Sequence, residues 1–221
     1  MAGSRPIITY FDVRGRVEVI RLIFEELGIA YEERHVIGDE WQALKPKTPF
    51  GGLPIYREGD LHLVQSRAIF RYLARKHGLY GRDEADYAHC DIVAEALDDA
   101  EISLWRWLCD AEPGKKRASF AAGELSVTLG NLQKWFGRNG ADAQFWVGDA
   151  LTYADFMAYA YLEEVRVFFP EALAQFPCLH AFHHRIAARP RIAAYLASPR
   201  LLADFGYGPR GRIKDPAFTT R

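Results

Sequence analysis

The sequence predicts an α/β domain followed by an all-helical domain, and three observations support this fold class. In the N-terminal part, β-favouring apolar runs and helical patterns follow the order βαβ, a loop, and then ββα. The stretch from Gly78 to Asp83 contains two glycines and interrupts this pattern. Beyond it, apolar residues recur at helical spacing as far as Pro199. We therefore expect two domains, at residues 1–81 and 82–221.

The N-terminal elements follow from local patterns. The first strand is an apolar run that ends in a turn, and the helix after it is amphipathic and stops at a glycine. A tight turn over residues 58–60 joins the last two strands. The expected strands are Ile7–Phe11, Ala30–Ile37, Leu53–Arg57 and Leu61–Val64, and the expected helices are Val17–Leu27 and Ser66–His77.

Two residues near the third strand indicate a binding site. Pro54 cannot donate a hydrogen bond to a central ladder, which is explained either by a cis peptide bond or by an ordinary trans proline at an edge. Ser66 suits the N-cap of the following helix, whose free amides and partial positive charge would accept a carboxylate. A cap without a ligand is the alternative.

The C-terminal part is expected to be helical, with an irregular glycine-containing tail after Pro199. Thr152 and Asp155 form a capping box in which Asp replaces the usual Glu, so a helix should start there. The expected helices are Tyr87–Leu108, Phe120–Phe136, Tyr153–Phe168, Leu179–Ala188 and Arg191–Leu196.

The net charge, the cysteines and the lengths of the apolar runs argue against several classes of function. The formal net charge of −1 gives no general attraction to nucleic acid or to acidic membranes. The three cysteines have no CxxC spacing and an odd count, which argues against a disulfide framework and for a reducing compartment. No apolar run reaches the roughly 18 residues of a membrane span, and no signal peptide is recognisable. We expect a cytoplasmic protein.

Several ordered motifs resemble those of the cytosolic glutathione transferases of the tyrosine type. Residues 9–16 resemble the start of these classes, and residues 65–69 resemble the family's glutathione-binding helix start. Residues 41–45 and 49–54 are most similar to the sigma class, which includes glutathione-dependent prostaglandin D synthase, and then to the pi class. The resemblance runs from Ile8 to Pro199 and implies a thioredoxin-like N-terminal domain with a helical bundle domain.

The resemblance implies that Tyr10 activates the thiol of glutathione. A thiolate is the nucleophile, and a phenol O–H directed at the sulfur stabilises the anion by a charge-assisted hydrogen bond. Arg16 would add positive potential nearby. The implied function is a glutathione transferase that acts on hydrophobic electrophiles in detoxification. A half-buried structural role for Tyr10 is the alternative.

The remaining glutathione contacts are also implied by the resemblance. Trp41 and Lys45 would bind the glycine end, and the Leu53 backbone would pair with the cysteinyl unit. Gln65 and Ser66 would receive the γ-glutamyl carboxylate. The full implied set is Phe11, Arg16, Trp41, Lys45, Gly52, Leu53, Pro54, Gln65, Ser66 and Asp99.

Gly52 departs from the family pattern, which usually has Gln or Lys at this position. A glycine offers only its backbone, so one side-chain contact to glutathione is missing. Lys47 or Arg57 could compensate for it.

The second substrate is expected between the two domains, in a cleft lined by aromatic side chains that favours hydrophobic electrophiles. Trp105 and Trp107 point to different faces of one helix, so at least one of them belongs to the core. The candidate lining residues are Val13, Trp105, Trp107, Cys109, Tyr153, Phe205 and Tyr207.

An acidic group on the long helix has two interpretations. Glu95, Asp98 and Asp99 match positions that bind a divalent ion in the sigma-class synthase, with Glu replacing one Asp. A row of carboxylates on a helix is more often solvated or paired with arginine. We expect glutathione as co-substrate and no metal.

A homodimer is expected because Asp99, in its family role, reaches the γ-glutamyl ammonium only across an interface. Phe50 is a candidate dimer contact. Two alternatives to conjugation stay open, namely a glutathione-dependent isomerase or peroxidase and a non-catalytic binding or structural protein on the same fold. The sequence does not identify the natural electrophile.

Overall fold

The computed structural model describes residues 4–109, 113–140 and 142–206. Its N-terminal part contains a four-stranded sheet in the order β2-β1-β3-β4. Strand β1 (Ile7–Tyr10) pairs in parallel with β2 (Glu32–His35) and antiparallel with β3 (Ile55–Glu58), and β3 pairs antiparallel with β4 (Leu61–Val64). This mixed sheet confirms the predicted α/β fold class.

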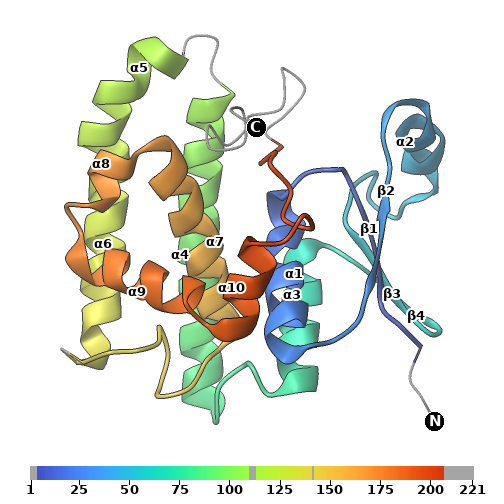
Figure 1. Ribbon diagram of the computed structural model, residues 1–221, viewed down its shortest axis with the longest axis horizontal. Coiled ribbons are helices and arrows are strands. Elements are labelled where there is room, and N and C mark those ends of the chain that lie inside the picture. The colour runs from blue at the N-terminus through green and yellow to red at the C-terminus, as the bar shows by residue number, and fades with distance from the viewer. Residues whose placement is uncertain (1–3, 110–112, 141, 207–221) are drawn as a thin grey trace.

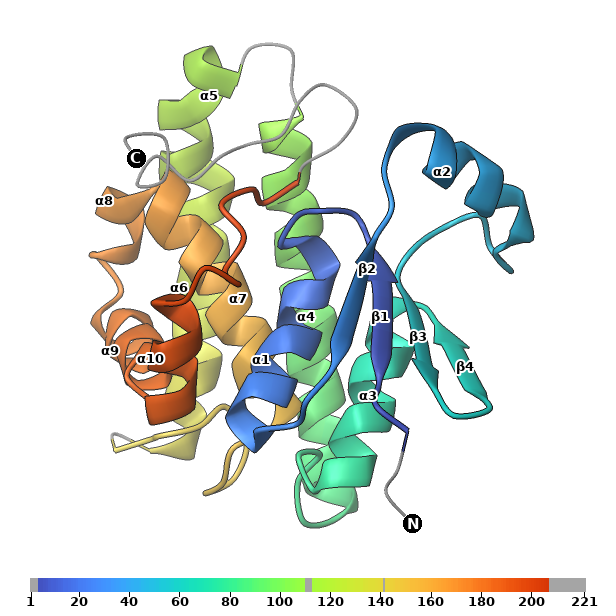
Figure 2. The same cartoon turned by 45° about the vertical axis from the view of Figure 1, so that its right-hand side comes forward.

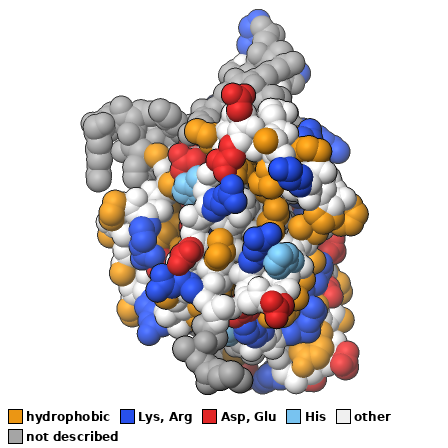
Figure 3. Space-filling model, turned by 90° about the vertical axis from the view of Figure 1, so that its right-hand side faces the viewer, with side chains coloured by type: hydrophobic (Ala, Val, Ile, Leu, Met, Phe, Trp, Pro, Cys, Tyr) orange, Lys and Arg blue, Asp and Glu red, His pale blue; other side chains and the backbone are white. Residues whose placement is uncertain are grey.

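Helices α1 (Glu18–Leu27) and α3 (Ser66–His77) lie between the sheet and the helical part of the chain, as Figures 1 and 2 show. Helix α2 (Gly38–Leu44) lies at the far side of the sheet. Short 3-10 turns at Gly15–Val17 and Lys45–Lys47 precede α1 and follow α2. Figure 3 shows basic and acidic side chains interspersed on the face that carries the sheet edge.

The C-terminal part is helical in the ranges that the structure describes. Helix α7 is its centre, since it packs against α4, α8, α9 and also α1 of the N-terminal part. None of the described helices is both long enough and apolar enough to cross a bilayer. The helices are α4 (Glu84–Leu108), α5 (Pro113–Phe120), α6 (Ser126–Phe136), α7 (Tyr153–Phe168), α8 (Pro170–Leu173), α9 (Pro177–Ala187) and α10 (Pro190–Leu196).

The predicted capping box is confirmed. Thr152 is the N-cap of α7, and the buried Asp155 carboxylate accepts hydrogen bonds from the Thr152 amide at 2.7 Å and the Thr152 hydroxyl at 2.9 Å. It also accepts from the Trp146 amide at 2.9 Å. One carboxylate therefore satisfies donors of both the helix start and the preceding loop.

Several element bounds differ from the prediction, and three of these differences have a clear structural description. Strand β3 begins at Ile55 rather than Leu53, because Pro54 has no amide hydrogen for the ladder. Helix α4 begins at Glu84, since Asp83 caps it by accepting from the amides of residues 85 and 86, both at 3.0 Å. The helix expected at 120–136 continues α5 through a π-helical segment, Ala121–Leu125.

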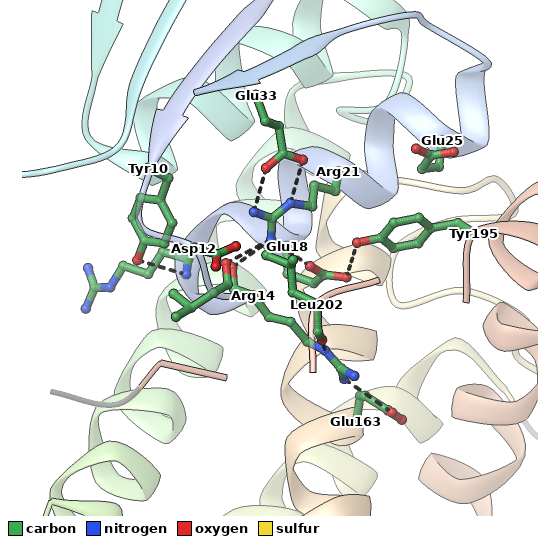
Figure 4. Close-up of polar contacts among 12 residues, drawn as sticks. Tyr10, Asp12, Arg14, Glu18, Arg21, Glu25, Glu33, Glu163, Tyr195 and Leu202 are labelled. Carbon is green, nitrogen blue, oxygen red and sulfur yellow. Dashed lines mark hydrogen bonds and ion pairs between the residues drawn. The ribbon is translucent and has the colours of Figure 1, made fainter. Parts of the chain in front are cut away.

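A fully buried arginine fixes the loop that follows β1 (Figure 4). Arg21 of α1 donates through Nη1 to the backbone carbonyls of Val13 and Arg14, each at 3.1 Å. Its Nε and Nη2 form a bidentate pair with Glu33 of β2 at 2.9 and 2.8 Å. Nη1 also reaches Glu18 at 3.0 Å. A fork of five N–H donors suits this role because its geometry is rigid.

The segment from Leu202 to Gly206 contacts the same loop from the other side. The Arg14 amide donates to the Asp204 carbonyl at 2.7 Å, and the Gly15 amide donates to the Phe205 carbonyl at 3.2 Å. The Arg14 guanidinium lies over the Phe205 ring, 4.3 Å from its centroid. The loop is therefore held by α1 on one side and by the C-terminal segment on the other.

Replacing Arg21 with Met should destabilise the protein by about 3–5 kcal/mol, because two carboxylates and two carbonyls lose their buried partner. Urea unfolding measures this loss as a lower midpoint at an unchanged slope. Burial alone would raise the pKa of Glu33, but the Arg21 hydrogen bonds lower it below its ordinary value of 4.5. The stabilisation is therefore present above that pH and is lost as the pH falls below it.

Arg5→Ala is the matched control, since the Arg5–Glu32 pair is more than half exposed on both sides. It should cost less than about 1 kcal/mol. Equal losses in the two variants would contradict a special role for the buried arginine.

Candidate active site

Tyr10 ends β1 and is only 8% exposed. Its hydroxyl oxygen accepts a hydrogen bond from the Arg16 amide at 3.3 Å. Burial raises the pKa of Tyr10 above its ordinary value, although the Arg16 amide and charge act in the opposite direction. The phenol is thus protonated at neutral pH, and its O–H can donate to another group.

Gly15 allows the loop to pass close to this hydroxyl. Its φ is +42°, and a Cβ at this position would lie 2.8 Å from the Tyr10 hydroxyl oxygen. A side chain here would be strained and would collide with the phenol. The glycine therefore sets the position of the loop against Tyr10.

A cavity of about 200 Å³ opens beside Tyr10. Phe11 and Arg16 line it from the β1 side, Trp105 lines it from α4, and Phe205 lines it from the C-terminal segment. Its wall is mostly apolar, with an arginine next to the phenol. The cavity is lined by residues of the sheet part and of the helical part of the chain, and it is the candidate site for the second substrate.

The start of α3 differs from the prediction in one respect. Ser66 is the first helical residue rather than the N-cap, which is Gln65, and no side chain caps the helix. Gln65 has a φ of 69° and is the one non-glycine residue with positive φ in the described ranges. The helix therefore spans the predicted range Ser66–His77, but the N-cap prediction for Ser66 was wrong by one residue. Backbone strain of the kind that Gln65 shows is concentrated at functional sites.

The other predicted glutathione contacts lie around the ends of β1 and β3. The peptide bond between Leu53 and Pro54 is cis, one of the two forms that the sequence allowed. Phe11 packs edge to face on Trp41, with ring centroids 5.3 Å apart. Lys45 follows α2, and its amide donates to the Trp41 carbonyl. Trp41 is therefore fixed next to the Tyr10 strand.

The atoms around position 52 do not require a glycine there. A Cβ at this position would come no closer than 3.9 Å to any other group, here the Phe50 carbonyl oxygen. A Cβ at position 52 would therefore meet no clash.

Some candidates for the second-substrate cavity lie elsewhere. Trp107 stacks on Phe120 at 5.5 Å inside the helical part, because residues two apart project from nearly opposite sides of a helix. Tyr153 is buried and donates its hydroxyl to Asp91 at 2.7 Å, so it belongs to the core. These two assignments need correction.

The other residues predicted to line the second-substrate cavity differ in where they lie. Val13 is buried against the C-terminal segment, since a Cβ on Gly206 would lie 2.4 Å from it. Cys109 is the C-cap of α4 and does not line the cavity. Tyr207 lies outside the described residues. Trp105 and Phe205 do line the cavity.

Glu101 and Ile102 also line the cavity, but they were not among the residues predicted from the sequence. Glu101 precedes Trp105 by four positions, so the two share one face of α4. That spacing was the available signal. Glu101 also borders a smaller cavity of about 30 Å³, together with Arg16, Ser66 and Arg67.

The acidic group on α4 is divided between two faces. Asp98 forms an ion pair with Arg67, and Glu95 pairs with Arg71 at 2.5 Å. Asp99 faces a groove between α4 and α6, which Glu124 also lines. Within the described ranges no cluster of three or more His, Cys, Asp or Glu residues could hold a metal.

Comparisons with protein families identify two regions of this chain. Residues 6–75 match the family model of the glutathione S-transferase N-terminal domain. Residues 98–199 match a model of the glutathione S-transferase C-terminal domain.

Individual relatives cover most of the chain. A glutathione S-transferase P of Caenorhabditis elegans is 36% identical over 190 residues, which span 86% of this chain and 90% of the relative. The human glutathione S-transferase P is 34% identical over 195 residues, spanning 87% of this chain and 91% of that protein.

Solved structures show the same similarity. The pi-class glutathione S-transferase of Onchocerca volvulus superposes with a TM-score of 0.83 at 30% identity, covering 86% of this chain and 91% of that one. The structure described as rat hPGDS complexed with a quinoline superposes with a TM-score of 0.76 at 31% identity, covering 87% of this chain and 96% of that one. With both domains and nearly full-length relatives matched, the chain belongs to the glutathione S-transferase family.

Proposed function

We propose that this protein is a glutathione transferase in which Tyr10 stabilises the glutathione thiolate for attack on a hydrophobic electrophile. The observation that carries the proposal is the protonated Tyr10 hydroxyl next to an apolar cavity. A phenol that keeps its proton is a hydrogen-bond donor, and a donor directed at sulfur favours the thiolate. The thiol proton leaves to solvent, and the thiolate then forms the bond to the electrophile.

The proposed glutathione site uses the backbone around the cavity. The γ-glutamyl carboxylate would bind at Gln65 and Ser66, where the uncapped start of α3 offers amides and a partial positive charge. The cysteinyl unit would pair with the backbone of Leu53, which precedes the β3 ladder. Trp41 and Lys45 would bind the glycine end. The proposal includes these glutathione contacts. It also includes the division of the chain into two domains, at residues 1–81 and 82–221.

Phe11, Trp105 and Phe205 give the proposed electrophile site its aromatic wall. Such a surface favours flat, apolar electrophiles over charged ones. Arg16 contributes positive potential near the position of the sulfur, which would favour the thiolate further.

We propose a homodimer in which Asp99 acts across the interface. Asp99 is exposed in the groove between α4 and α6 and does not line the cavity of its own chain. Exposed apolar side chains at Ile92 of α4, Val127 of α6 and Phe50 offer contact area. The three cysteines are free, which accords with a cytoplasmic location.

Tyr10→Phe should raise the pKa of the bound glutathione thiol, because the hydrogen bond to the thiolate is lost. Ultraviolet thiolate absorbance against pH measures this directly. At pH 7 we expect kcat/KM with an aryl halide to fall about 10²-fold, with the rate profile displaced to higher pH.

The control for this variant is Tyr153→Phe, which removes a buried hydroxyl remote from the cavity. It should lower stability and leave the thiol pKa unchanged. If glutathione binds wild type with the pKa of free glutathione, the proposed activation by Tyr10 is wrong.

Gly52→Gln should strengthen glutathione binding, because the site has room for a side chain that can make one further hydrogen bond. One such bond, about 0.5–1.5 kcal/mol, lowers Kd about 2- to 10-fold, and titration calorimetry measures the change. Gly137→Gln is the control, since Gly137 also has open space but lies in a turn after α6. An unchanged Kd would show that the missing side chain does not limit affinity.

Mixing Tyr10→Phe with Asp99→Asn subunits tests the action of Asp99 across the interface. A mixed dimer then contains one site with both intact residues, so activity should recover to about a quarter of wild type after random exchange. If Asp99 acts within its own chain, no site is intact and mixing restores nothing. Sedimentation analysis of each variant confirms that dimers form.

A further inference from the structure

We propose that Glu101 is a further catalytic residue of this site, a general acid for the addition of glutathione to activated alkenes such as enones. This inference rests on the proposed transferase function and assigns a proton donor to the same site.

The position of Glu101 is the first support. Glu101 of α4 lines the same cavity as Tyr10 of β1. An electrophile in this cavity would have the thiolate on the Tyr10 side and the Glu101 carboxyl on the α4 side. A general acid must lie within hydrogen-bond reach of the atom that it protonates, and a cavity of about 200 Å³ keeps these groups close.

The surroundings of Glu101 are the second support. In the ranges that the structure describes, no hydrogen bond or ion pair holds its carboxyl, whereas Asp98 one turn earlier is paired with Arg67. Burial raises the pKa of Glu101, although Arg16 and Arg67 act in the opposite direction. The titratable groups around it are Tyr10 of β1, Arg16 before α1, Arg67 of α3, and Tyr161 and Glu164 of α7.

The chemical step balances without a further reactant. The thiolate forms a carbon–sulfur bond at the β-carbon of the enone, and the alkene electron pair moves toward the carbonyl to give an enolate. Glu101 transfers its proton to the α-carbon, and the carboxylate recovers a proton from water. That proton replaces the one that the thiol released when it ionised. Substitution on an aryl halide releases chloride and needs no such proton.

This difference gives the test. Wild type and Glu101→Gln are compared with trans-4-phenyl-3-buten-2-one, an enone, and with 1-chloro-2,4-dinitrobenzene, an aryl halide. Glutamine keeps the shape of the side chain and cannot donate an acidic proton. We expect the ratio of the two kcat/KM values, enone over aryl halide, to fall about 10²-fold in the variant.

The pH dependence provides a second readout. In wild type the same ratio should fall as the pH rises through the carboxyl pKa, because the proton donor is lost, and in Glu101→Gln it should be flat. Glu101→Asp moves the carboxyl back by one methylene and should recover part of the ratio. Glu84→Gln, in the exposed first turn of α4, should change neither rate.

The outcomes separate the two proposals. An equal fall with both substrates, or no change in the ratio, overturns the role of Glu101 and leaves the transferase proposal intact. A thiol pKa that falls in Glu101→Gln also overturns it, because only an ionised carboxyl would oppose the thiolate. Absence of aryl halide conjugation in wild type overturns the transferase proposal and this inference with it.

Discussion

The buried guanidinium of Arg21 is the interaction on which the candidate site depends. Arg21 lies in α1. Its side chain binds the carbonyls of the loop after Tyr10 and the Glu18 carboxylate of the same helix, and it also binds Glu33 of strand β2. Glu18 extends the network, since it also accepts from the Tyr195 hydroxyl of α10 at 3.0 Å. A buried charge is tolerated here because nearly all of its donors have acceptors.

The same network explains how the loop after β1 is held at a defined position against the Tyr10 hydroxyl. Catalytic groups must be held to within fractions of an ångström, and loops alone rarely achieve this. Here the carbonyls of the loop are bound by α1 and its amides by residues 204 and 205. Gly15 permits the close approach to Tyr10 that these contacts impose. The site is rigid because its loop is bonded on both sides.

Local signals explain why most of the fold followed from the sequence. These signals come from residues that are close together in the sequence. They are the capping box of α7, the glycines that end α1 and α3, and the β-favouring apolar runs of the strands. The N-cap of α3 was predicted one residue too late because the strained backbone of Gln65 has no sequence signature. The π-helical segment before α6 likewise gave no signal.

The cavity wall depended on packing between distant segments, and there the sequence was a weaker guide. Trp105 and Trp107 could not be distinguished until the orientation of α4 was known, and Tyr153 was assigned to the cavity although its hydroxyl serves Asp91. Arg21 carries no motif at all. Its role exists only because β2 places Glu33 beside it.

The contact between the Tyr10 loop and residues 202–206 also determines when the cavity can form during synthesis. Arg14 and Leu202 are 188 positions apart, so their hydrogen bond cannot form until almost all of the described chain has left the ribosome. The sheet and the early helices can assemble before that point, because proteins of this size fold progressively from the N-terminus. A nascent chain would therefore have the phenol and its strand long before it had the wall that Phe205 supplies. The strand that carries the proposed thiol-activating residue is thus made well before the segment that completes the wall of the proposed substrate pocket.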